Sequence, residues 1–386
     1  MAKEIKKLAF VLSTNGLEND DRVRKEVISI QKNGGYEIKI FAKVTENKYK
    51  EGVTSYGTPY KLIYLKTRDI FSSSRFLIFK IMEMYFRLRR ELKQYDLIWC
   101  ADDGMFIFPL LIRKIRIIWD LHEIPILFLK NSITRQLFHF IERQCDLIIH
   151  ANQFRLKYLL EEKIVSQPRK HIIIRNFPDR EFINSTLLPN SYYIIKKWLK
   201  GTKYVYLQGI SADSRYPYNS VASILSTTDY KIIITADKVD EDVNKKLQVE
   251  FAEAYFNRVY FTGMLDQLYT PSIIKEAVFS MVFYNINTPN NRYCEANRFY
   301  QSLVFGVPVI CGCNEPMKEM IDNYHCGIAL ESDGSNVYKI KAAIKKILDN
   351  YSYYKNNAAI IKDVLIWDDK YISDVIQKLE CGPNRK

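Results

Sequence analysis

The stretch NRYCEANRFYQSLVFGVPVICG, residues 291–312, decides the fold. A polar loop leads into apolar and aromatic residues with helical spacing, which predict a short helix over residues 295–305. Gly306 ends this helix because glycine takes a positive φ without steric cost, and Pro308 follows where no helix can continue. Residues 307–310 then predict a buried strand of a parallel sheet. The stretch therefore predicts one helix-to-strand step of an α/β protein.

The composition is that of an ordinary globular chain. Its 386 residues are enough for two or three domains, and 47% hydrophobic residues supply material for two cores. No apolar run approaches the roughly 20 residues of a membrane span. The basic N-terminus has an apolar run too short for a signal peptide, and it predicts a first strand instead. The seven cysteines are scattered and odd in number, so we expect no disulfide framework and a cytoplasmic protein.

The formal net charge of +13 indicates anionic partners. The chain has no helix-turn-helix, zinc-finger or aromatic RNA-binding pattern, so we expect no nucleic acid. Nucleoside diphosphates and an anionic membrane surface explain the charge equally well. Cys311, Cys313, His325 and Cys326 lie close in sequence, but they lack the paired spacing of a zinc site, so we expect no metal.

Apolar strand, polar loop and helical segment alternate along the first half of the chain. Most strand candidates are short branched runs without alternation, as expected where helices cover both faces of a parallel sheet. Ligands bind such sheets at the carboxyl ends of the strands, so residues directly after each run are the candidates for a site. The predicted strands of this half cover residues 8–12, 37–41, 61–65, 96–99, 115–119, 146–149 and 172–174.

The composition changes over residues 181–202, where Asn, Ser, Pro and Lys surround a short helical run. The strand pattern restarts at residues 204–207. We therefore predict a first domain over residues 1–190 and a second over residues 191–365. The remaining residues, 366–386, are predicted to form a C-terminal helix that crosses back to the first domain.

The opening stretch resembles the signature Pro-Asn-Lys-x-x-Glu-x-x-x-x-Gly-x-Pro-Val-Ile of the family 4 glycosyltransferases, which use nucleotide sugars. Two positions depart from it: Ala296 stands where the family has Pro, and Gln301 where it has the Glu that binds the donor ribose. The resemblance implies an α/β protein of the GT-B fold, with two Rossmann-like domains facing each other across a cleft. The positions that fit the signature are Asn297, Arg298, Phe299, Gly306, Pro308, Val309 and Ile310.

Other segments resemble the family's motifs and follow its order along the chain. Residues 20–26 are similar to Asp-x-Arg-Val-x-x-Glu, and residues 119–123 to Tyr-Asp-x-His-Glu. Residues 204–215 are similar to a Tyr-x-Gly-Gly loop ending in Arg-Gly, except that Tyr216 follows Arg215 in place of Gly. Weaker likenesses cover residues 145–152, 175–179, 259–264, 277–284, 315–328 and 366–368.

The resemblance assigns donor binding to the second half of the chain. Arg215 and Arg298 are expected to clamp the diphosphate and stabilise its developing charge, helped by the N–H groups that open the helix near Glu295. No metal ion or other cofactor is then required. Gln301 loses the charge assistance of Glu, on the order of 1–2 kcal/mol, and Glu295 is a candidate to replace part of it. The expected donor-binding residues are Gly209, Arg215, Met264, Tyr284, Glu295, Asn297, Arg298 and Gln301.

Acceptor binding is assigned to the first half. His122 follows a strand between two carboxylates, where its ring can donate one hydrogen bond and accept another from sugar hydroxyls. Local pairing with Asp120 or Glu123 is the structural alternative for His122, as helix capping is for Asp21. The expected acceptor-binding residues are Asn15, Gly16, Asp21, Arg22 and His122, and the expected catalytic residues are His122, Asp102, Arg215 and Arg298.

Residues 71–90, FSSSRFLIFKIMEMYFRLRR, are basic, aromatic and amphipathic. They form either a helix packed on the sheet or a helix lying in a membrane interface with arginines on lipid phosphates. The interfacial alternative predicts peripheral contact with an anionic membrane, at the inner face of the cell membrane.

The resemblance implies a metal-independent, hexosyltransferase-like enzyme with a donor of the UDP or GDP type. The acceptor is expected to be a glycan or polyprenyl-linked glycan in surface polysaccharide biosynthesis, with retention of configuration. Two alternatives remain open. One is a non-catalytic GT-B scaffold that binds a glycan or an active transferase, and the other is a nucleotide-sugar epimerase or a phosphorylase of the same fold.

Overall fold

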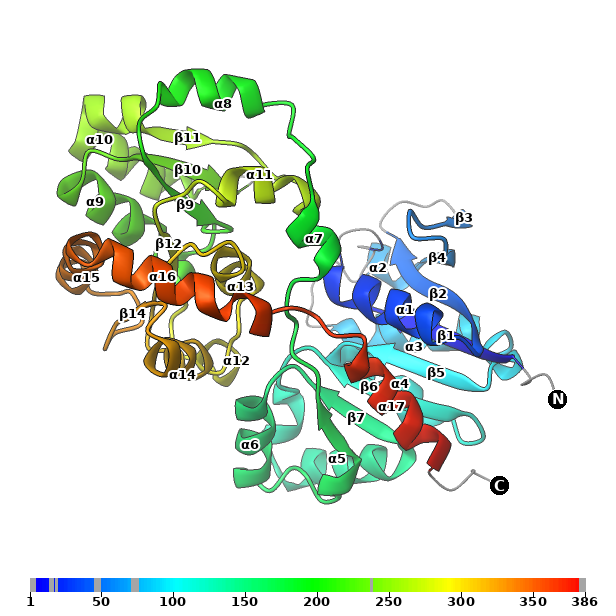
Figure 1. Cartoon of the computed structure of the whole chain (residues 1–386). Coiled ribbons are helices and arrows are strands. Elements are labelled where there is room, and N and C mark those ends of the chain that lie inside the picture. The colour runs from blue at the N-terminus through cyan, green and yellow to red at the C-terminus, as the bar shows by residue number, and fades with distance from the viewer. Residues whose placement is uncertain are drawn as a thin grey trace. The chain divides into compact units, whose positions relative to one another are not determined.

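The computed structural model describes residues 5–13, 17, 20–44, 50–70, 76–236 and 239–381. The chain forms two compact units: unit 1 comprises Met1–Arg175 and Asp368–Lys386, and unit 2 comprises Asn176–Trp367 (Figure 1). The first boundary lies before residue 190 because Phe177 and Phe182 are buried in the core of unit 2. Where the chain enters and leaves unit 2, the Trp367 amide donates a 2.8 Å hydrogen bond to the Pro178 carbonyl.

Unit 1 is built on one sheet, whose described strands run in the order β3-β4-β2-β1-β5-β6-β7-β8. Among them, β3 and β4 pair antiparallel, and the other neighbours pair parallel. The strands are β1 (Lys6–Leu12), β2 (Tyr36–Val44), β3 (Lys50–Val53), β4 (Pro59–Tyr64), β5 (Leu97–Ala101), β6 (Arg116–Leu121), β7 (Leu147–His150) and β8 (His171–Ile173).

The helices of unit 1 connect these strands. Helix α1 begins after Asp20, whose side chain accepts a 3.2 Å hydrogen bond from the Val23 amide, so Asp20 caps the helix. The described helices are α1 (Asp21–Asn33), α2 (Thr67–Ile70), α3 (Leu77–Leu88), α4 (Ile107–Leu111), α5 (Ser132–Gln144), α6 (Gln153–Glu161) and α17 (Lys370–Cys381).

Helix α17 belongs to unit 1 although the sequence of unit 2 precedes it. It packs against α1, and Asp369 anchors its first turn. The Asp369 carboxylate accepts 2.6 Å from the Ser29 hydroxyl and 2.9 Å from the Lys32 ammonium group. These contacts give the C-terminal segment a fixed place in unit 1.

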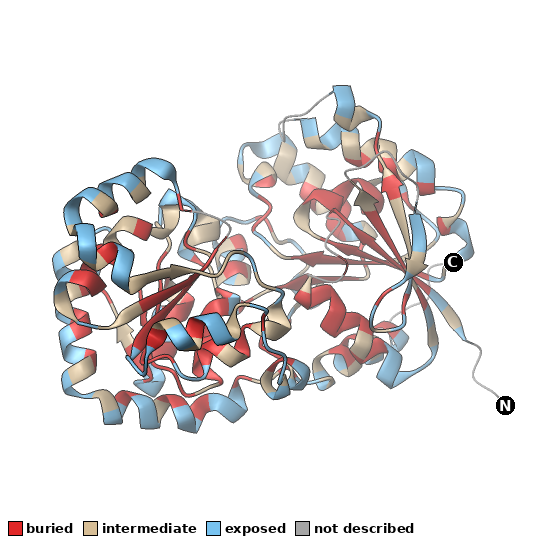
Figure 2. Ribbon diagram, turned by 90° about the horizontal axis from the view of Figure 1, so that it is seen from above, coloured by how far each residue is buried: buried red, intermediate tan, exposed pale blue. Residues whose placement is uncertain are grey.

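Unit 2 is built on a second sheet, and its described strands run β11-β10-β9-β12-β13-β14, all parallel. Successive residues of β9 point to opposite faces: Tyr204 and Tyr206 join one buried cluster, Val205 and Leu207 another. Each face is thus covered by helices, and buried residues follow the strands of both units (Figure 2). The strands are β9 (Tyr204–Gln208), β10 (Lys231–Thr235), β11 (Val259–Phe261), β12 (Ser280–Val282), β13 (Val309–Cys311) and β14 (Gly327–Ala329).

Most helices of unit 2 cover one of the two clusters. Residues of α7, α8, α11, α13 and α14 join the cluster that contains Tyr206, residues of α9, α10 and α15 join the other, and α16 contributes to both. Their bounds are α7 (Arg180–Asn184), α8 (Tyr192–Leu199), α9 (Pro217–Thr227), α10 (Glu241–Arg258), α11 (Pro271–Ile274), α12 (Pro289–Arg292), α13 (Asn297–Leu303), α14 (Glu315–Tyr324), α15 (Val337–Asp349) and α16 (Tyr351–Ile361).

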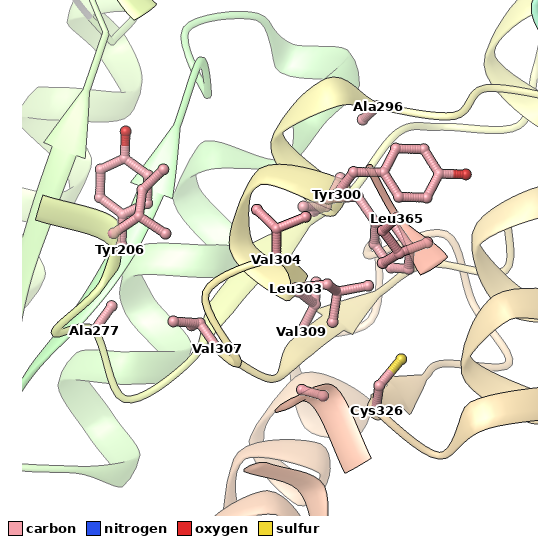
Figure 3. Packing of buried hydrophobic residues seen from close by; sticks show 14 of the residues in the cluster. Tyr206, Ala277, Ala296, Tyr300, Leu303, Val304, Val307, Val309, Cys326 and Leu365 are labelled. Atoms are coloured by element: carbon pink, nitrogen blue, oxygen red, sulfur yellow. The ribbon is translucent and has the colours of Figure 1, made fainter. Parts of the chain in front are cut away.

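The opening stretch of the sequence forms the helix-to-strand step that it predicts, with shorter elements. Gly306 has φ 69°, and the Val307 amide still bonds the Ser302 carbonyl at 3.1 Å, so the strand begins only at Val309. Figure 3 shows side chains of α13, including Leu303, packed in one cluster with Val309 of β13. The step therefore anchors α13 to the centre of unit 2.

Strands β3 and β10 lie in segments for which the sequence predicted neither a strand nor a family motif. Strand β3 is a four-residue edge strand with exposed polar residues, so it carries little hydrophobic signal. Strand β10, with the apolar run KIIIT, carries the same signal as its neighbours and lies between β9 and β11. In the part of the chain that the structure describes, no helix is both long and apolar enough to cross a membrane.

Candidate functional site

Helix α13 brings Arg298 to the carboxyl ends of two neighbouring strands of unit 2. The Arg298 side chain is 6% exposed, and its Nη1 donates to the Gln208 carbonyl at the end of β9. Its Nη2 donates at 3.3 Å to the Phe283 carbonyl, directly after β12. Within the described part of the chain, the buried Nε has no hydrogen-bond partner. Because a guanidinium group has five N–H donors, these two bonds leave donors for a ligand.

Arg215 reaches the same place from the loop after β9. It ends the 3₁₀ turn Asp213–Arg215, and its Nη1 donates to the Gly209 carbonyl. Gly209 has φ 60°, and a Cβ atom there would lie 3.0 Å from Nη1 of Arg215 and 3.6 Å from Nη1 of Arg298. A glycine is therefore needed where the two guanidinium groups approach the backbone.

Tyr284 lies beside both guanidinium groups. Its ring centroid is 5.2 Å from the Cζ atom of Arg215 and 4.8 Å from that of Arg298. A ring face attracts a cation without neutralising it. The four residues Gly209, Arg215, Tyr284 and Arg298 form one cluster, which we call the arginine pair site.

The arginine pair site has an unbalanced positive charge. In the described part of the chain, neither Arg215 nor Arg298 forms an ion pair with a carboxylate. Burial lowers the pKa of Arg298; Tyr284 opposes that shift, and the neighbouring charge of Arg215 adds to it. Two adjacent cations at the carboxyl ends of parallel strands, with no carboxylate partner among the described residues, are suited to an anionic ligand.

The other expected donor residues lie around this site with different degrees of burial. Gln301 is 2% exposed, and its buried Oε1 has no hydrogen-bond partner among the residues that the structure describes. Asn297 is exposed, and its Oδ1 accepts from Asn176 Nδ2 at 2.9 Å. Glu295 is half-buried, and Met264 is 70% exposed.

A second polar cluster lies at the strand ends of unit 1, around Asp120. The fully buried Asp120 carboxylate accepts from Arg22 at 2.9 Å and 2.8 Å, and its Oδ2 lies 2.9 Å from Nε2 of His122. Arg22 also donates to the Ile174 carbonyl at 2.8 Å. Asp120 therefore holds both the arginine and the imidazole in fixed orientations.

The protonation states of His122 and Asp120 depend on each other and on Arg22. Burial alone would lower the pKa of His122, but the Asp120 carboxylate raises it to about 9. Burial likewise opposes ionisation of Asp120, whereas Arg22 and His122 hold its pKa below its usual value. His122 is therefore an imidazolium at neutral pH, and both of its nitrogens donate, whereas we expected one donor and one acceptor.

Asp102 follows β5 and faces the same strand ends. Its backbone has φ 97° and ψ 151°, a region open mainly to glycine. Its carboxylate accepts from the Ser13 hydroxyl and, at 2.8 Å, from the Asp103 amide. Burial and the adjacent Asp102 carboxylate raise the pKa of Asp103 to about 8. Two neighbouring carboxyl groups thus share one proton near neutral pH.

The remaining acceptor residues have structural partners or lie outside the described residues. The carboxylate of Asp21 is 2.9 Å from Arg24 and 2.6 Å from Lys25 on the same helix. Asn15 and Gly16 are outside the described residues. Among the residues described, no group of three or more His, Cys, Asp or Glu side chains is arranged to hold a metal ion.

One residue of the His122 surroundings carried no signal in the sequence. Arg155 of α6 donates through Nη1 to the His122 carbonyl and through Nη2 to Glu123 at 3.0 Å. It belongs to no motif that we recognised, and its role depends on the pairing of β6 with β7. A hollow of about 520 Å³ also lies along β8 and α17, but none of the expected site residues lines it.

The fold is shared with glycosyltransferases of known structure. A sucrose-phosphate synthase from Thermosynechococcus elongatus is 13% identical, with a TM-score of 0.72, over 97% of this chain and 98% of that chain. Anabaena HepE in complex with UDP and glucose is 12% identical, with a TM-score of 0.71, over 97% and 99%. The E. coli trehalose-6-phosphate protein bound with UDP-2-fluoro glucose is 11% identical, with a TM-score of 0.74, over 98% and 99%.

The chain therefore has the α/β GT-B fold, as its sequence predicts. No protein-family profile and no curated protein matches it. At these low identities the likeness establishes the fold alone. The resemblance to family 4 remains a prediction from the motifs.

The pKa shifts of unit 1 predict how stability depends on pH. The stabilising charge on His122 is fully present below pH 6.5 and is lost as pH rises through about 9. Asp103 adds a second loss of stability, which begins as the pH rises above 3.8 and is complete near pH 8. The urea concentration at the midpoint of unfolding should therefore decrease as the pH is raised from 6.5 to 9.

The variants His122→Gln and Asp103→Asn separate the two groups. Between pH 8 and 9 the slope belongs to His122, so His122→Gln should flatten it while Asp103→Asn leaves it in place. An unchanged slope in the His122→Gln protein would show that the imidazole titrates normally.

Proposed function

We propose that the protein is a glycosyltransferase that moves a sugar from a nucleoside-diphosphate donor to an acceptor hydroxyl. The observation that carries this proposal is the arginine pair site on a GT-B fold. Two guanidinium groups meet on Tyr284 without a carboxylate counter-ion in the described part of the chain. A diphosphate supplies the missing negative charge, and two planar groups with several N–H donors suit its oxygens.

The donor assignment extends to the residues of α13. Gln301 has a buried oxygen without a partner, which can accept a hydrogen bond from one ribose hydroxyl while its amide donates to another. Asn297 is exposed at the start of the helix and is available to a phosphate or the ribose. Solved neighbours include HepE in complex with UDP-glucose, which supports a donor of the UDP type. GDP is the alternative nucleotide.

The acceptor is assigned to unit 1. His122, with both nitrogens as donors, can hold sugar hydroxyls through Nδ1 while Nε2 remains on Asp120. Asp102 and Asp103 present carboxyl oxygens that accept from hydroxyls. We propose a glycan or polyprenyl-linked glycan as the acceptor, in surface polysaccharide biosynthesis. Two neighbours are named for sugar phosphates, so hexose phosphates belong in the same screen.

The reaction breaks the bond between the anomeric carbon and the diphosphate oxygen and forms one to the acceptor oxygen. The arginine pair stabilises the charge that develops on the departing diphosphate. In the retaining route the acceptor proton passes to that diphosphate on the same face of the sugar. His122, charged at neutral pH, orients the sugar and does not serve as the base. No residue of this account needs a metal ion or a cofactor.

Helix α3 supports peripheral contact with an anionic membrane at the inner face of the cell membrane. Its Ile81, Met84 and Leu88 are buried against unit 1, as a packed helix requires. Its Phe79 and Phe86 are each about half exposed, and the guanidinium of Arg89 lies 5.4 Å from the Phe86 ring. The exposed aromatic and basic groups suit a headgroup layer. Residues 71–75 of the predicted segment lie outside the described residues.

A nucleotide panel tests the proposal against the non-catalytic scaffold. Calorimetry with UDP and GDP should show binding of at least one, and a screen of nucleotide sugars should show slow hydrolysis of its sugar conjugate. A scaffold without a donor site gives no heat with either nucleotide. An epimerase would change the donor sugar without releasing the nucleotide.

The first variant is Arg298→Ala, which should weaken binding of the active nucleotide by at least tenfold, about 1.4 kcal/mol. Arg292→Ala is the matched control, because Arg292 pairs with Glu315 at the surface, outside the arginine pair site. Calorimetry measures the affinity, and circular dichroism checks the fold because Arg298 also bonds two carbonyls. Full nucleotide affinity in a folded Arg298→Ala protein would refute the diphosphate clamp.

The second variant is Gln301→Glu, which should maintain or raise nucleotide affinity. The carboxylate would accept hydrogen bonds from both ribose hydroxyls, and Arg298 lies one turn earlier on α13. Titration of the wild type and the variant with the same nucleotide gives the ratio of affinities. A tenfold fall would mean that residue 301 faces an apolar or anionic neighbour and does not contact the ribose.

A further prediction concerns binding to lipid vesicles. Each arginine near an anionic surface contributes about 1 kcal/mol within a Debye length, so binding should require anionic lipid and weaken steeply with salt. Reversing the charges of Arg87, Arg89 and Arg90 should abolish co-sedimentation with such vesicles while nucleotide affinity stays unchanged. If the wild type ignores anionic vesicles at low salt, α3 is a packed helix only and the acceptor is soluble.

A further inference from the structure

Tyr216 has a backbone conformation that favours glycine. It joins the 3₁₀ turn of Arg215 to helix α9 with φ 51° and ψ 54°, in the left-handed region. An aromatic residue rarely adopts this conformation because its Cβ crowds the following carbonyl. Its amide bonds the Asp213 carbonyl at 3.0 Å, and its carbonyl accepts from the Ser220 amide at 3.0 Å. The conformation is thus built into the start of α9 and needs an interaction that maintains it.

The phenol of Tyr216 provides that interaction. Its hydroxyl donates to Oδ2 of Asp333 at 2.6 Å, in the loop after β14. Burial opposes ionisation of Asp333, but this hydrogen bond and those from Ser335 hold its pKa below the usual value. A hydrogen bond to a charged acceptor is among the stronger kinds in proteins. Tyr216 and Asp333 therefore connect the loop after β9 to the loop after β14, and we call them the tyrosine–aspartate lock.

Neighbouring contacts fix the loop that carries Asp333. The Ser335 amide donates to Asp333 Oδ1 at 3.1 Å, and Asn219 Nδ2 donates to the Gly334 carbonyl at 2.9 Å. Gly334 has φ 106°, and a Cβ atom there would lie 2.6 Å from the Phe283 ring. The loop is therefore pressed on Phe283, whose carbonyl receives Nη2 of Arg298. Asp333 thus has a defined position relative to the arginine pair site.

Arg215 depends on this arrangement because it directly precedes Tyr216. Its side chain must turn back to the Gly209 carbonyl and the Tyr284 ring. The direction of its Cα–Cβ bond is set by the backbone on both sides of it. On the preceding side, the Ser214 carbonyl accepts from the Asn285 amide at 2.8 Å. On the following side, the Tyr216 side chain anchors the turn through its hydrogen bond to Asp333.

We propose that Tyr216 and Asp333 are positioning residues for Arg215: their lock holds the left-handed turn that aims the guanidinium at the donor diphosphate. This inference rests on the proposed donor site. Neither residue is assigned to the proposed donor site, so their effect on binding passes through Arg215. A glycine at position 216 would leave the turn flexible, whereas the tyrosine–aspartate lock fixes the orientation of the preceding arginine.

The test compares two phenol–carboxylate pairs on the same helix. Tyr216→Phe removes the hydroxyl that bonds Asp333, and Tyr218→Phe is the matched control because its hydroxyl bonds Glu250 instead. Calorimetry with UDP and GDP on the whole chain should show at least a fivefold loss of affinity in Tyr216→Phe and less than twofold in Tyr218→Phe. Asp333→Asn, which keeps a neutral acceptor, should show a smaller loss than Tyr216→Phe.

A double variant separates positioning from a general structural effect. In the Arg215→Ala background, Tyr216→Phe should cause no further loss of nucleotide affinity. An equal loss in both backgrounds, or full affinity in Tyr216→Phe, would overturn the inference and leave the proposed donor site standing. If the wild type binds neither UDP nor GDP, the proposed function fails and the inference fails with it.

Discussion

The arrangement at the carboxyl end of the second sheet depends on keeping two positive charges together with no carboxylate counter-ion in the described part of the chain. Burying a charge costs several kcal/mol unless it is paired. Here Arg298 is compensated by two backbone carbonyls and a ring face, and Arg215 by one carbonyl and the same ring. These groups lessen the cost without removing the charge. Binding of an anion, such as the diphosphate of the proposed donor, would complete the compensation.

At the carboxyl ends of the strands in unit 1, the buried arginine is instead paired with a carboxylate. Arg22 is as buried as Arg298, but its Nε and Nη2 both donate to the Asp120 carboxylate. Glu26 also lies 3.1 Å from its Nε. The pairing leaves His122 as the group with an unused donor. One sheet end thus has two arginines without a carboxylate partner among the described residues, and the other has an arginine paired with a buried carboxylate. This difference supports the proposed assignment of the donor to unit 2 and the acceptor to unit 1.

The sequence predicted the elements whose signals are local. Gly306 and Pro308 located the turn between α13 and β13, because each has few alternative backbone conformations. The resemblance named Gly209, Arg215, Tyr284 and Arg298, and the structure brings these four together. Met264 shows no recorded contact with them. Whether these residues bind a donor stays a prediction.

The features that the sequence did not predict depend on packing between distant segments. Tyr216 departs from the family motif as a sequence, but its backbone takes the conformation that a glycine would take. The carbonyls that hold Arg298 have no side-chain signal, since any residue at 208 or 283 supplies one. The charge on His122 follows from a carboxylate that is itself fixed by an arginine 98 residues earlier. Unit 2 begins at Asn176, earlier than the predicted residue 191, because Phe177 and Phe182 pack into its core.

The most direct test of the unbalanced charge is a pair of calorimetric titrations of the unmodified protein, with UDP and with uridine, at low and high salt. If the arginine pair holds a diphosphate, UDP should bind at least tenfold more tightly than uridine, a difference of about 1.4 kcal/mol. The advantage should shrink as salt rises, because part of it is electrostatic. Equal affinities for UDP and uridine, or an advantage that salt leaves unchanged, would contradict the account.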